Sequence, residues 1–415
     1  MLRARLRNSL LVTGAAVACS SGASDESNGL TSQEELLITQ QPAVITGLVY
    51  REQMGQLDLT EAGPDGAAPV VEPPYDLTAI AGENAAEILN ASLRAEAKAA
   101  DLGLVASVMM VDAEGRIWAD FVDSALAYGA PPVTAPASGL PAEDDDFAEK
   151  GLSNSTDNRL YLGTGSNWTD THSALSRIGD LSPGACSGAL FGRRLVLTAA
   201  HCVVNAGGSW SYREFAPRRR GDTYPYGSSQ QWGTIWPTAY TANNCHTTFV
   251  GSTCVKYDFA VMVLPDPPSF DSHPGWMGVA TSNDGTMASW YRSNVGYPSC
   301  GSSTSPPNCV AKEPFGDIFG CSGVTPQFDQ GSSSNSWPWG DGSHPRMKTG
   351  CDTNSGHSGS PVYTYSAGAN GPYIIGNSQW NLCTTCSPST DLSSAGVKVN
   401  SALGNWMISL RTTYP

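Results

Sequence analysis

The sequence predicts an all-β protein that ends in one helix and is preceded by a small α+β region. Beyond residue 151, short β-like runs alternate with clusters of Gly, Ser, Pro and Asn, as in barrels and sandwiches. Ten of the 11 cysteines lie between Cys186 and Cys386, and the acidic charge lies upstream of residue 151. The chain has 415 residues, of which 40% are hydrophobic, so two or three domains are expected and disorder throughout is excluded.

The charge of the chain is unevenly distributed. Residues 20–150 hold 23 Asp and Glu against five Lys and Arg, whereas residues 151–415 hold 15 of each kind. The formal net charge of −15 therefore belongs to the upstream part. We place a domain boundary near residue 150, and no basic surface indicates nucleic acid as a partner.

Residues 1–18 resemble a secretory signal peptide. Three arginines precede an apolar run over residues 10–18, whose small final residues are typical of a cleavage site just before Cys19. The segment also resembles a bacterial lipoprotein signal, in which Cys19 would carry lipid. The alternative is that Cys19 is an unused thiol. No later segment has the 18 or so continuous apolar residues of a membrane span, so we expect an exported protein, secreted or held at the outer membrane or cell surface by lipid.

Residues 19–150 are expected to form an acidic propeptide or N-terminal region. Apolar residues at helical spacing predict a helix over residues 83–100, closed by Gly103, and residues 104–122 read as two strands joined by a turn at residues 112–115. Residues 131–150 are rich in Pro, Ala and Ser and end in an acidic run, which predicts a disordered linker. Exposed disordered segments are where proteases cut, so Lys150–Gly151 is a candidate processing site.

The downstream part, residues 151–415, contains four clear strand candidates and one helix. The strands are LVLTAAH, FAVMVL, PVYTYS and YIIGNSQW, and the helix is SALGNWMISLR near the C-terminus. The run Arg218–Arg219–Arg220 after Pro217 indicates an exposed loop.

Three residues in the downstream part suggest nucleophilic catalysis: His201 in LTAAHC, Asp258 before an apolar strand, and Ser358 in GHSGSPV. A serine hydroxyl needs an imidazole to take its proton, and the imidazole needs a carboxylate to fix its tautomer. The alternatives are a packed core histidine and an aspartate that caps a turn. Ser358 is preferred to Ser360 because glycines stand at its −2 and +1 positions, and the N–H groups of Gly356 and Ser358 would form the oxyanion hole.

These segments resemble the chymotrypsin-like serine peptidases, and more closely the glutamyl-endopeptidase (V8-like) branch of secreted bacterial enzymes. TAAHC and GxSGSPV match residue for residue, and the resemblance covers about residues 151–415. Weaker matches occur at Asp157–Asn158–Arg159, Pro225–Tyr226–Gly227, Gly296–Tyr297–Pro298 and Asp352–Thr353. The resemblance implies two six-stranded antiparallel β-barrels with His201, Asp258 and Ser358 in the cleft between them.

The resemblance also implies positions for substrate recognition, with departures from the family pattern. Trypsin-like activation pairs an Asp just before the nucleophile with a freed N-terminal amine, but this chain has His357 there. The strand in which glutamyl-specific relatives carry a substrate-binding His has none, so glutamate specificity is not expected. Asp352 stands where trypsin-like enzymes select Lys or Arg, although Asp–Thr is also a family signature without that role. The residues expected to line or flank the pocket are Asp352, Thr353, Ser378, Gln379 and Trp380.

The ten downstream cysteines predict about five disulfides in an oxidising compartment. The resemblance implies that Cys186 pairs with Cys202 near His201. By proximity in the sequence we pair the others as Cys245 with Cys254, Cys300 with Cys309, Cys321 with Cys351, and Cys383 with Cys386. We expect no metal and no cofactor, because Cys383-Thr-Thr-Cys386 lacks a second ligand pair.

The sequence thus predicts an exported serine endopeptidase, made as a precursor and acting as a monomer on protein or peptide substrates, with its own propeptide as partner. Two alternatives remain open. One is a non-catalytic binding protein on a peptidase scaffold, and the other is a surface lipoprotein with a permanent N-terminal module.

Overall fold

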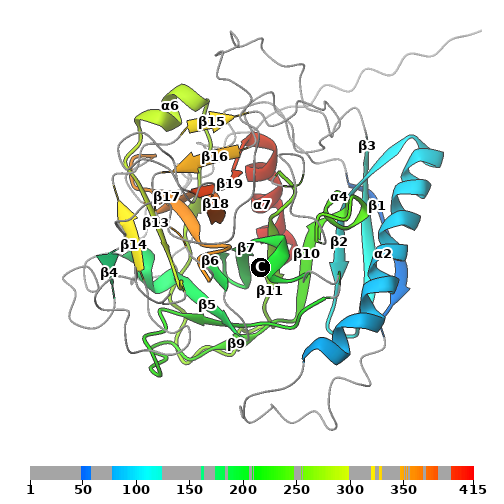
Figure 1. Ribbon diagram of the computed structural model, residues 1–415, viewed down its shortest axis with the longest axis horizontal. Coiled ribbons are helices and arrows are strands. Elements are labelled where there is room, and N and C mark those ends of the chain that lie inside the picture. Colours follow the sequence, from blue (N-terminus) through cyan, green and yellow to red (C-terminus); the bar gives the residue numbers. More distant parts are fainter. Residues whose placement is uncertain are drawn as a thin grey trace, which may run out of the picture.

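A computed structural model gives the arrangement of the chain (Figure 1). It describes residues 48–57, 77–123, 160–162, 173–182, 186–204, 208, 210–246, 254, 256–298, 319–322, 327–329, 346–349, 351, 353, 356–367, 371–381 and 394–415. The leader, Cys19, the linker 131–150 and the Lys150–Gly151 bond lie outside these residues.

The N-terminal region is a three-stranded antiparallel sheet covered by one helix. It contains β1 (Leu48–Gln56), α2 (Leu77–Leu102), β2 (Leu104–Val111) and β3 (Arg116–Asp123), with β3 in the middle. The predicted turn joins β2 to β3: the Asp112 side chain accepts the N–H groups of Glu114 and Arg116, and Gly115 has a φ of 75°. Helix α2 and strands β2 and β3 confirm the sequence prediction, whereas β1 was not predicted.

This region extends the sheet of the downstream part. The first sheet has ten strands in the order β1-β3-β2-β10-β11-β7-β6-β5-β8-β9, and all its pairs are antiparallel. Its downstream strands are β5 (Ile178–Ser182), β6 (Cys186–Gly192), β7 (Leu195–Thr198), β8 (Glu214–Pro217), β9 (Ser229–Gln230), β10 (Gly233–Pro237) and β11 (Ala260–Val263).

The junction between the two parts is the pairing of β2 with β10. Val108, Met109, Met110 and Val111 stand opposite residues 237 to 234, in that order. Side by side with this junction, α2 packs on α4 (Thr238–Ala242), as Figure 1 shows at the right of the molecule. The buried apolar side chains of the N-terminal region belong to the same core as those of the downstream part. The two parts therefore fold around one shared core.

The second sheet carries β12 to β19, together with β4 from the start of the downstream part. Its order is β15-β16-β19-β18-β17-β13-β14-β4, and β12 pairs with β18 in parallel. The strands are β4 (Leu160–Tyr161), β12 (Gly278–Val279), β13 (Arg292–Gly296), β14 (Phe319–Ser322), β15 (Gln327–Asp329), β16 (Arg346–Thr349), β17 (Pro361–Thr364), β18 (Tyr373–Asn381) and β19 (Ser394–Lys398).

Short helices and one C-terminal helix complete the fold. They are the 3-10 helices η1 (Ser173–Arg177) and η2 (Ala200–Cys202), with α6 (Asp284–Ser289) and α7 (Ser401–Thr413). Asn400 caps α7 by accepting the N–H of Leu403. The apolar face of this helix is buried, with Leu403, Trp406, Met407 and Leu410. The all-β class, the two sheets with antiparallel pairing except for β12 with β18, and the C-terminal helix are confirmed. The first sheet has ten strands where six were expected, and three of the four additional strands are β1, β2 and β3 of the N-terminal region.

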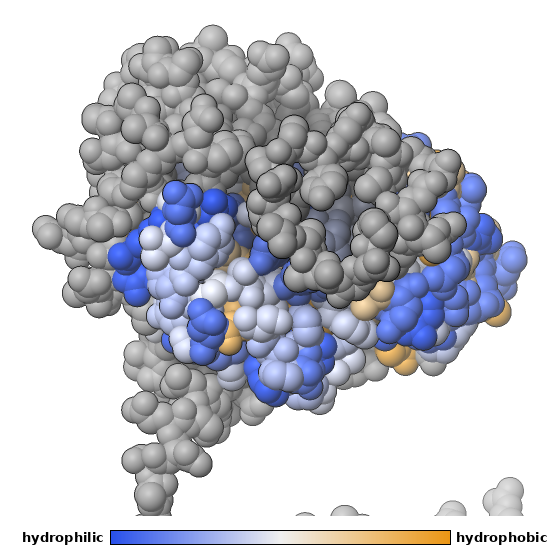
Figure 2. All heavy atoms as spheres, turned by 90° about the horizontal axis from the view of Figure 1, so that it is seen from below, coloured by the Kyte–Doolittle hydropathy of each residue, from blue (hydrophilic) through white to orange (hydrophobic). Residues whose placement is uncertain are grey.

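The hydropathy of the described residues characterises both the surface and the helices. On the face shown in Figure 2 the described surface is largely hydrophilic, with hydrophobic residues in small separate patches. Among the described residues, no helix is long and apolar enough to cross a membrane.

The prediction of an exposed loop at residues 218–220 is wrong for Arg219. Its guanidinium donates to the carboxylate of Asp180, which is fully buried in β5. Burial raises the pKa of Asp180 to about 6, although Arg219 and Ser182 act in the opposite direction. An arginine triplet alone gives no sign of a buried partner 39 residues upstream.

Candidate active site

His201 and Asp258 are brought together by the pairing of β7 with β11. His201 follows the end of β7, and Asp258 precedes the start of β11. Because these strands are antiparallel, with Thr198 opposite Ala260, the end of one adjoins the start of the other. Both strands are completely buried, so the two residues are held by the core of the protein.

Both carboxylate oxygens of Asp258 bond to His201. The backbone N–H of His201 donates to Oδ1 over 2.9 Å, and Nδ1 lies 2.7 Å from Oδ2. Asp258 has no exposed surface, and the His201 side chain is 9% exposed. An ionised carboxylate only accepts hydrogen bonds, so this pairing favours the tautomer with its proton on Nδ1. In that tautomer Nε2 is the basic nitrogen.

Ser358 lies in a tight turn before β17. The N–H of Ser360 donates to the carbonyl oxygen of His357 over 3.0 Å, which makes Ser358 and Gly359 the central residues of a β-turn. Gly359 has a φ of 82°, as the third position of a type II turn requires. A Cβ at Gly359 would lie 2.2 Å from Thr198 Oγ1 and 2.9 Å from the Ala199 nitrogen, so only glycine fits. The turn thus packs against the segment that leads to His201.

Ser187 of β6 attaches this turn to the first sheet. Its N–H donates to the carbonyl oxygen of Ser358, and its hydroxyl donates to that of Gly356, both over 2.7 Å. The same hydroxyl accepts the N–H of Tyr297 over 2.8 Å. Sequence reasoning missed Ser187, and the available signal was its place directly after Cys186.

The pocket residues expected from the sequence have different outcomes. Ser378 of β18 is buried and reaches the turn through its backbone: its carbonyl accepts the N–H of Gly359, and its N–H donates to Ser360 O. Thr353 is buried. Gln379 and Trp380 belong to β18, but their side chains lie outside the described residues, as does Asp352.

Two disulfides are present among the described residues, Cys186–Cys202 and Cys245–Cys254. Both are the pairs expected from the sequence. Cys351 is also disulfide-bonded. The side chains of Cys300, Cys309, Cys321, Cys383 and Cys386 lie outside the described part of the chain, so these pairings stay predictions.

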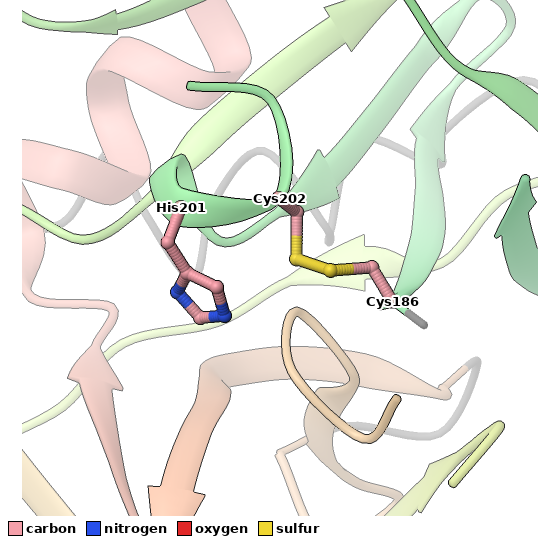
Figure 3. Close-up of side chains that lie close together, drawn as sticks. All are labelled: Cys186, His201 and Cys202. Carbon is pink, nitrogen blue, oxygen red and sulfur yellow. A yellow bond between two sulfur atoms is a disulfide. The ribbon is translucent and has the colours of Figure 1, made fainter. Parts of the chain in front are cut away.

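The Cys186–Cys202 disulfide lies beside His201 (Figure 3). The sulfur atoms and a ring nitrogen of His201 lie within 4.8 Å of one another. Cys202 Sγ also lies 3.6 Å from the carbonyl oxygen of Ser358. The disulfide therefore contacts both His201 and the turn that carries Ser358.

Loss of this disulfide is expected to lower both stability and activity. Replacement of Cys186 and Cys202 by Ala opens a loop of 16 residues and should lower the free energy of unfolding by about 3 kcal/mol. The matched control replaces Cys245 and Cys254, which close a loop of nine residues at comparable cost. Urea unfolding gives the stability, and kcat on a peptide substrate gives the activity. Equal loss of kcat in both double variants would contradict a specific role beside His201.

A histidine and an aspartate at adjoining strand ends, next to a serine turn from a second antiparallel sheet, define the chymotrypsin-like class of serine peptidases. The sequence model of the Trypsin family matches residues 170–402, which is more than half of the chain. The chain belongs to the Trypsin family.

Individual proteins resemble parts of the chain. A segment of 114 residues is 31% identical to the extracellular metalloprotease of Bacillus subtilis (strain 168) and covers 27% of this chain and 33% of that protein, so the match spans one third of the relative's length. A solved structure of Glu endopeptidase in complex with MPD aligns with a TM-score of 0.43 and 19% identity, covering 62% of this chain and 97% of that one. The protease Anisep from Arthrobacter nicotinovorans aligns with a TM-score of 0.37 and 20% identity, covering 55% and 91%.

The name of the Bacillus relative raises the question of a metal site. Within the described residues, the one group of His, Cys, Asp and Glu close enough to share an ion is Cys186, His201 and Cys202. The two sulfurs are bonded to each other, so they are not thiolate ligands. This group does not fit a metal.

Proposed function

We propose that residues 151–415 are a serine endopeptidase in which Ser358 is the nucleophile, His201 the general base and Asp258 the carboxylate that orients His201. The observation that carries this proposal is the double contact of Asp258 with the backbone and ring of His201. A buried carboxylate that bonds both groups is suited to hold an imidazole in one tautomer and to stabilise its charged form.

The reaction follows from these roles. Ser358 Oγ attacks the carbonyl carbon of the scissile peptide bond while His201 Nε2 takes the hydroxyl proton. The carbonyl oxygen becomes an oxyanion that the N–H groups of Gly356 and Ser358 stabilise. The imidazolium then gives its proton to the leaving amine, which departs and leaves an acyl-enzyme. Water, activated by the same imidazole, hydrolyses the ester and restores Ser358.

Ser360, the other serine of the segment, is the weaker candidate for the nucleophile. Its hydroxyl is fully buried and donates to Asn294 Oδ1 over 2.8 Å. A hydroxyl held in this way would have to give up a buried hydrogen bond before it could attack. This supports the choice of Ser358 that the glycine positions favour.

Substrate recognition is proposed for the segment around Ser378. Its hydroxyl is buried and has no hydrogen-bond partner among the described residues, and its backbone bonds the nucleophile turn. A substrate group would satisfy that hydroxyl. Four further residues are proposed to line or flank the same pocket: Asp352, Thr353, Gln379 and Trp380.

The chain is further proposed to be an exported precursor whose residues 20 to about 150 are a propeptide, cut near Lys150–Gly151. The pairing of β2 with β10 supports a role for this region in building the first sheet. Extracellular location is consistent with the disulfides, which persist in oxidising compartments. The shared core also favours the alternative of a permanent N-terminal module, which lipid on Cys19 would hold at the cell surface.

A fluorophosphonate tests the proposed activity. We expect the processed protein to be labelled at Ser358, as read by mass spectrometry of its peptides, and to cleave a denatured protein substrate. Ser358→Ala should abolish both results. The matched control, Ser289→Ala in α6, changes an exposed hydroxyl and should leave both unchanged. A folded wild-type protein that is not labelled, or is labelled at another serine, would refute the proposal.

A further inference from the structure

We propose that Asn294 is the positioning residue of the nucleophile turn, holding both ends of it through one side-chain oxygen. This inference rests on the proposed function, since it concerns the geometry of Ser358 and its oxyanion hole. It assigns to a neutral side chain the task that trypsin-like enzymes give to an Asp and a freed N-terminal amine.

Asn294 lies in the middle of β13, between β17 and β14. It pairs with Val362 on one side and with Cys321 on the other, so its backbone is fixed from both sides. Asn294 has no exposed surface. Such a residue can act as a rigid anchor for a neighbouring loop.

The side-chain oxygen of Asn294 accepts two hydrogen bonds from the turn. His357 Nε2 lies 2.8 Å from it, and the Ser360 hydroxyl donates to it over 2.8 Å. These are the first and last residues of the turn that carries Ser358. His357 is only 1% exposed and Ser360 is fully buried, so water does not compete for either bond. The Asn294 oxygen thus joins His357 to Ser360. The backbone hydrogen bond from the N–H of Ser360 to the carbonyl of His357 joins the same two residues.

The conformation of this turn sets the direction of the Ser358 N–H, the proposed donor of the oxyanion hole. The carbonyl of His357 and the N–H of Ser358 belong to one peptide unit, in which they point in opposite directions. Because the carbonyl bonds to the N–H of Ser360, the N–H of Ser358 points to the other side, where an oxyanion hole needs it. Loss of the Asn294 anchor would let this peptide unit rotate.

The Asn294 amide faces the turn with its oxygen and not with its nitrogen. Its Nδ2 is buried and has no hydrogen-bond partner among the described residues. The reversed amide would place Nδ2 against His357 Nε2 and the Ser360 hydroxyl and lose both acceptor contacts. A carboxylate would keep the acceptor and remove the unpartnered N–H groups, and protonation of His357 would compensate its charge. Asn294→Asp is therefore a conservative variant, and Asn294→Leu removes the acceptor at similar size.

The test compares kcat and KM of these variants on a peptide substrate. Loss of one oxyanion-hole donor costs about 10²-fold or more in kcat, so we expect Asn294→Leu to lose about 10²-fold with KM changed by less than about 3-fold. Asn294→Asp should restore kcat to within about 5-fold of wild type. The matched control is Asn400→Ala, which removes the cap of α7 and should lower stability without a change in kcat.

A second variant keeps the inference testable if Asn294→Leu does not fold. Ser360→Ala removes one of the two bonds to Asn294 and should lower kcat by about 10-fold, with KM unchanged. The inference is overturned if Asn294→Leu keeps wild-type kcat, if Asn294→Asp loses as much as Asn294→Leu, or if Ser360→Ala has no effect. A wild-type protein that does not react with fluorophosphonate would instead refute the proposed function itself.

Discussion

Asp258→Asn is expected to lower kcat by about 10⁴-fold while the protein stays folded. The Asn side chain has one acceptor and one donor in place of two acceptors. Its oxygen can keep the bond to the backbone N–H of His201, which preserves the fold of this segment. Its NH₂ group then faces Nδ1, which must become an acceptor, so the ring proton moves to Nε2. The nitrogen that faces the substrate can no longer take the proton of Ser358.

The measurement is kcat on a peptide substrate together with the unfolding midpoint in urea. The matched control is Asp222→Asn, an exposed aspartate between β8 and β9, which should keep wild-type kcat. A loss of less than about 10-fold in folded Asp258→Asn would show that His201 does not act as the base, since the tautomer argument requires a far larger effect.

Local patterns predicted six of the strands, β2, β3, β7, β11, β17 and β18, and the two long helices α2 and α7. The strands around LVLT, FAVMV and PVYT and the amphipathic C-terminal helix follow from side-chain periodicity and turn residues, which act within a few positions. Three short motifs in the order of the family pattern also singled out His201 and Asp258, although these residues lie 57 positions apart.

Contacts between distant strands were not predictable in the same way. Asn294, Ser187 and the pairing of β2 with β10 depend on which strands become neighbours, and no local period contains that information. Asn294 stands in an ordinary strand sequence, and only the fold places it 2.8 Å from His357. Sequence reasoning therefore singled out the proposed reacting groups but not the residues that hold them.

The second large effect concerns the N-terminal region. We expect a deletion variant that lacks residues 48–123 to yield at least about 10-fold less active enzyme than the wild-type chain. Without β2, strand β10 becomes an edge that leaves its N–H and C=O groups unpaired. Ile235 and Trp236, which are now almost completely buried, would lose their pairing with Met110 and Met109 of β2.

Specific contacts across this junction explain why the loss should be large. The hydroxyls of Ser92 in α2 and Thr241 in α4 lie 2.6 Å apart in a buried contact. At the other end, the Tyr414 hydroxyl lies 3.2 Å from the Met110 sulfur. Hydrogen bonds and apolar contacts here join the N-terminal region to two elements of the catalytic part, so each part stabilises the other.

A point substitution in the full-length chain tests the contact between β2 and β10 without shortening the chain. Met110→Asp places a carboxylate in the buried junction and should lower the free energy of unfolding of the precursor by more than about 3 kcal/mol. The matched control, Leu93→Asp, lies on the outer side of α2, where the side chain is 49% exposed. Active enzyme is counted by fluorophosphonate titration per mass of soluble protein, and N-terminal sequencing of that protein shows whether the region was cut away.

The pattern of yields decides what the N-terminal region does. Low yield for the deletion and for Met110→Asp, with normal yield for Leu93→Asp, is the result expected of a region that templates the first sheet. If sequencing finds mature enzyme beginning near Gly151, the region acts before the cut and its contacts with β10 are needed only for folding. If the chain begins at Cys19 or Ser20, the shared core is permanent and the propeptide hypothesis is wrong. Full yield from the deleted chain would show that β10 tolerates an open edge, which contradicts a role for β2 in folding.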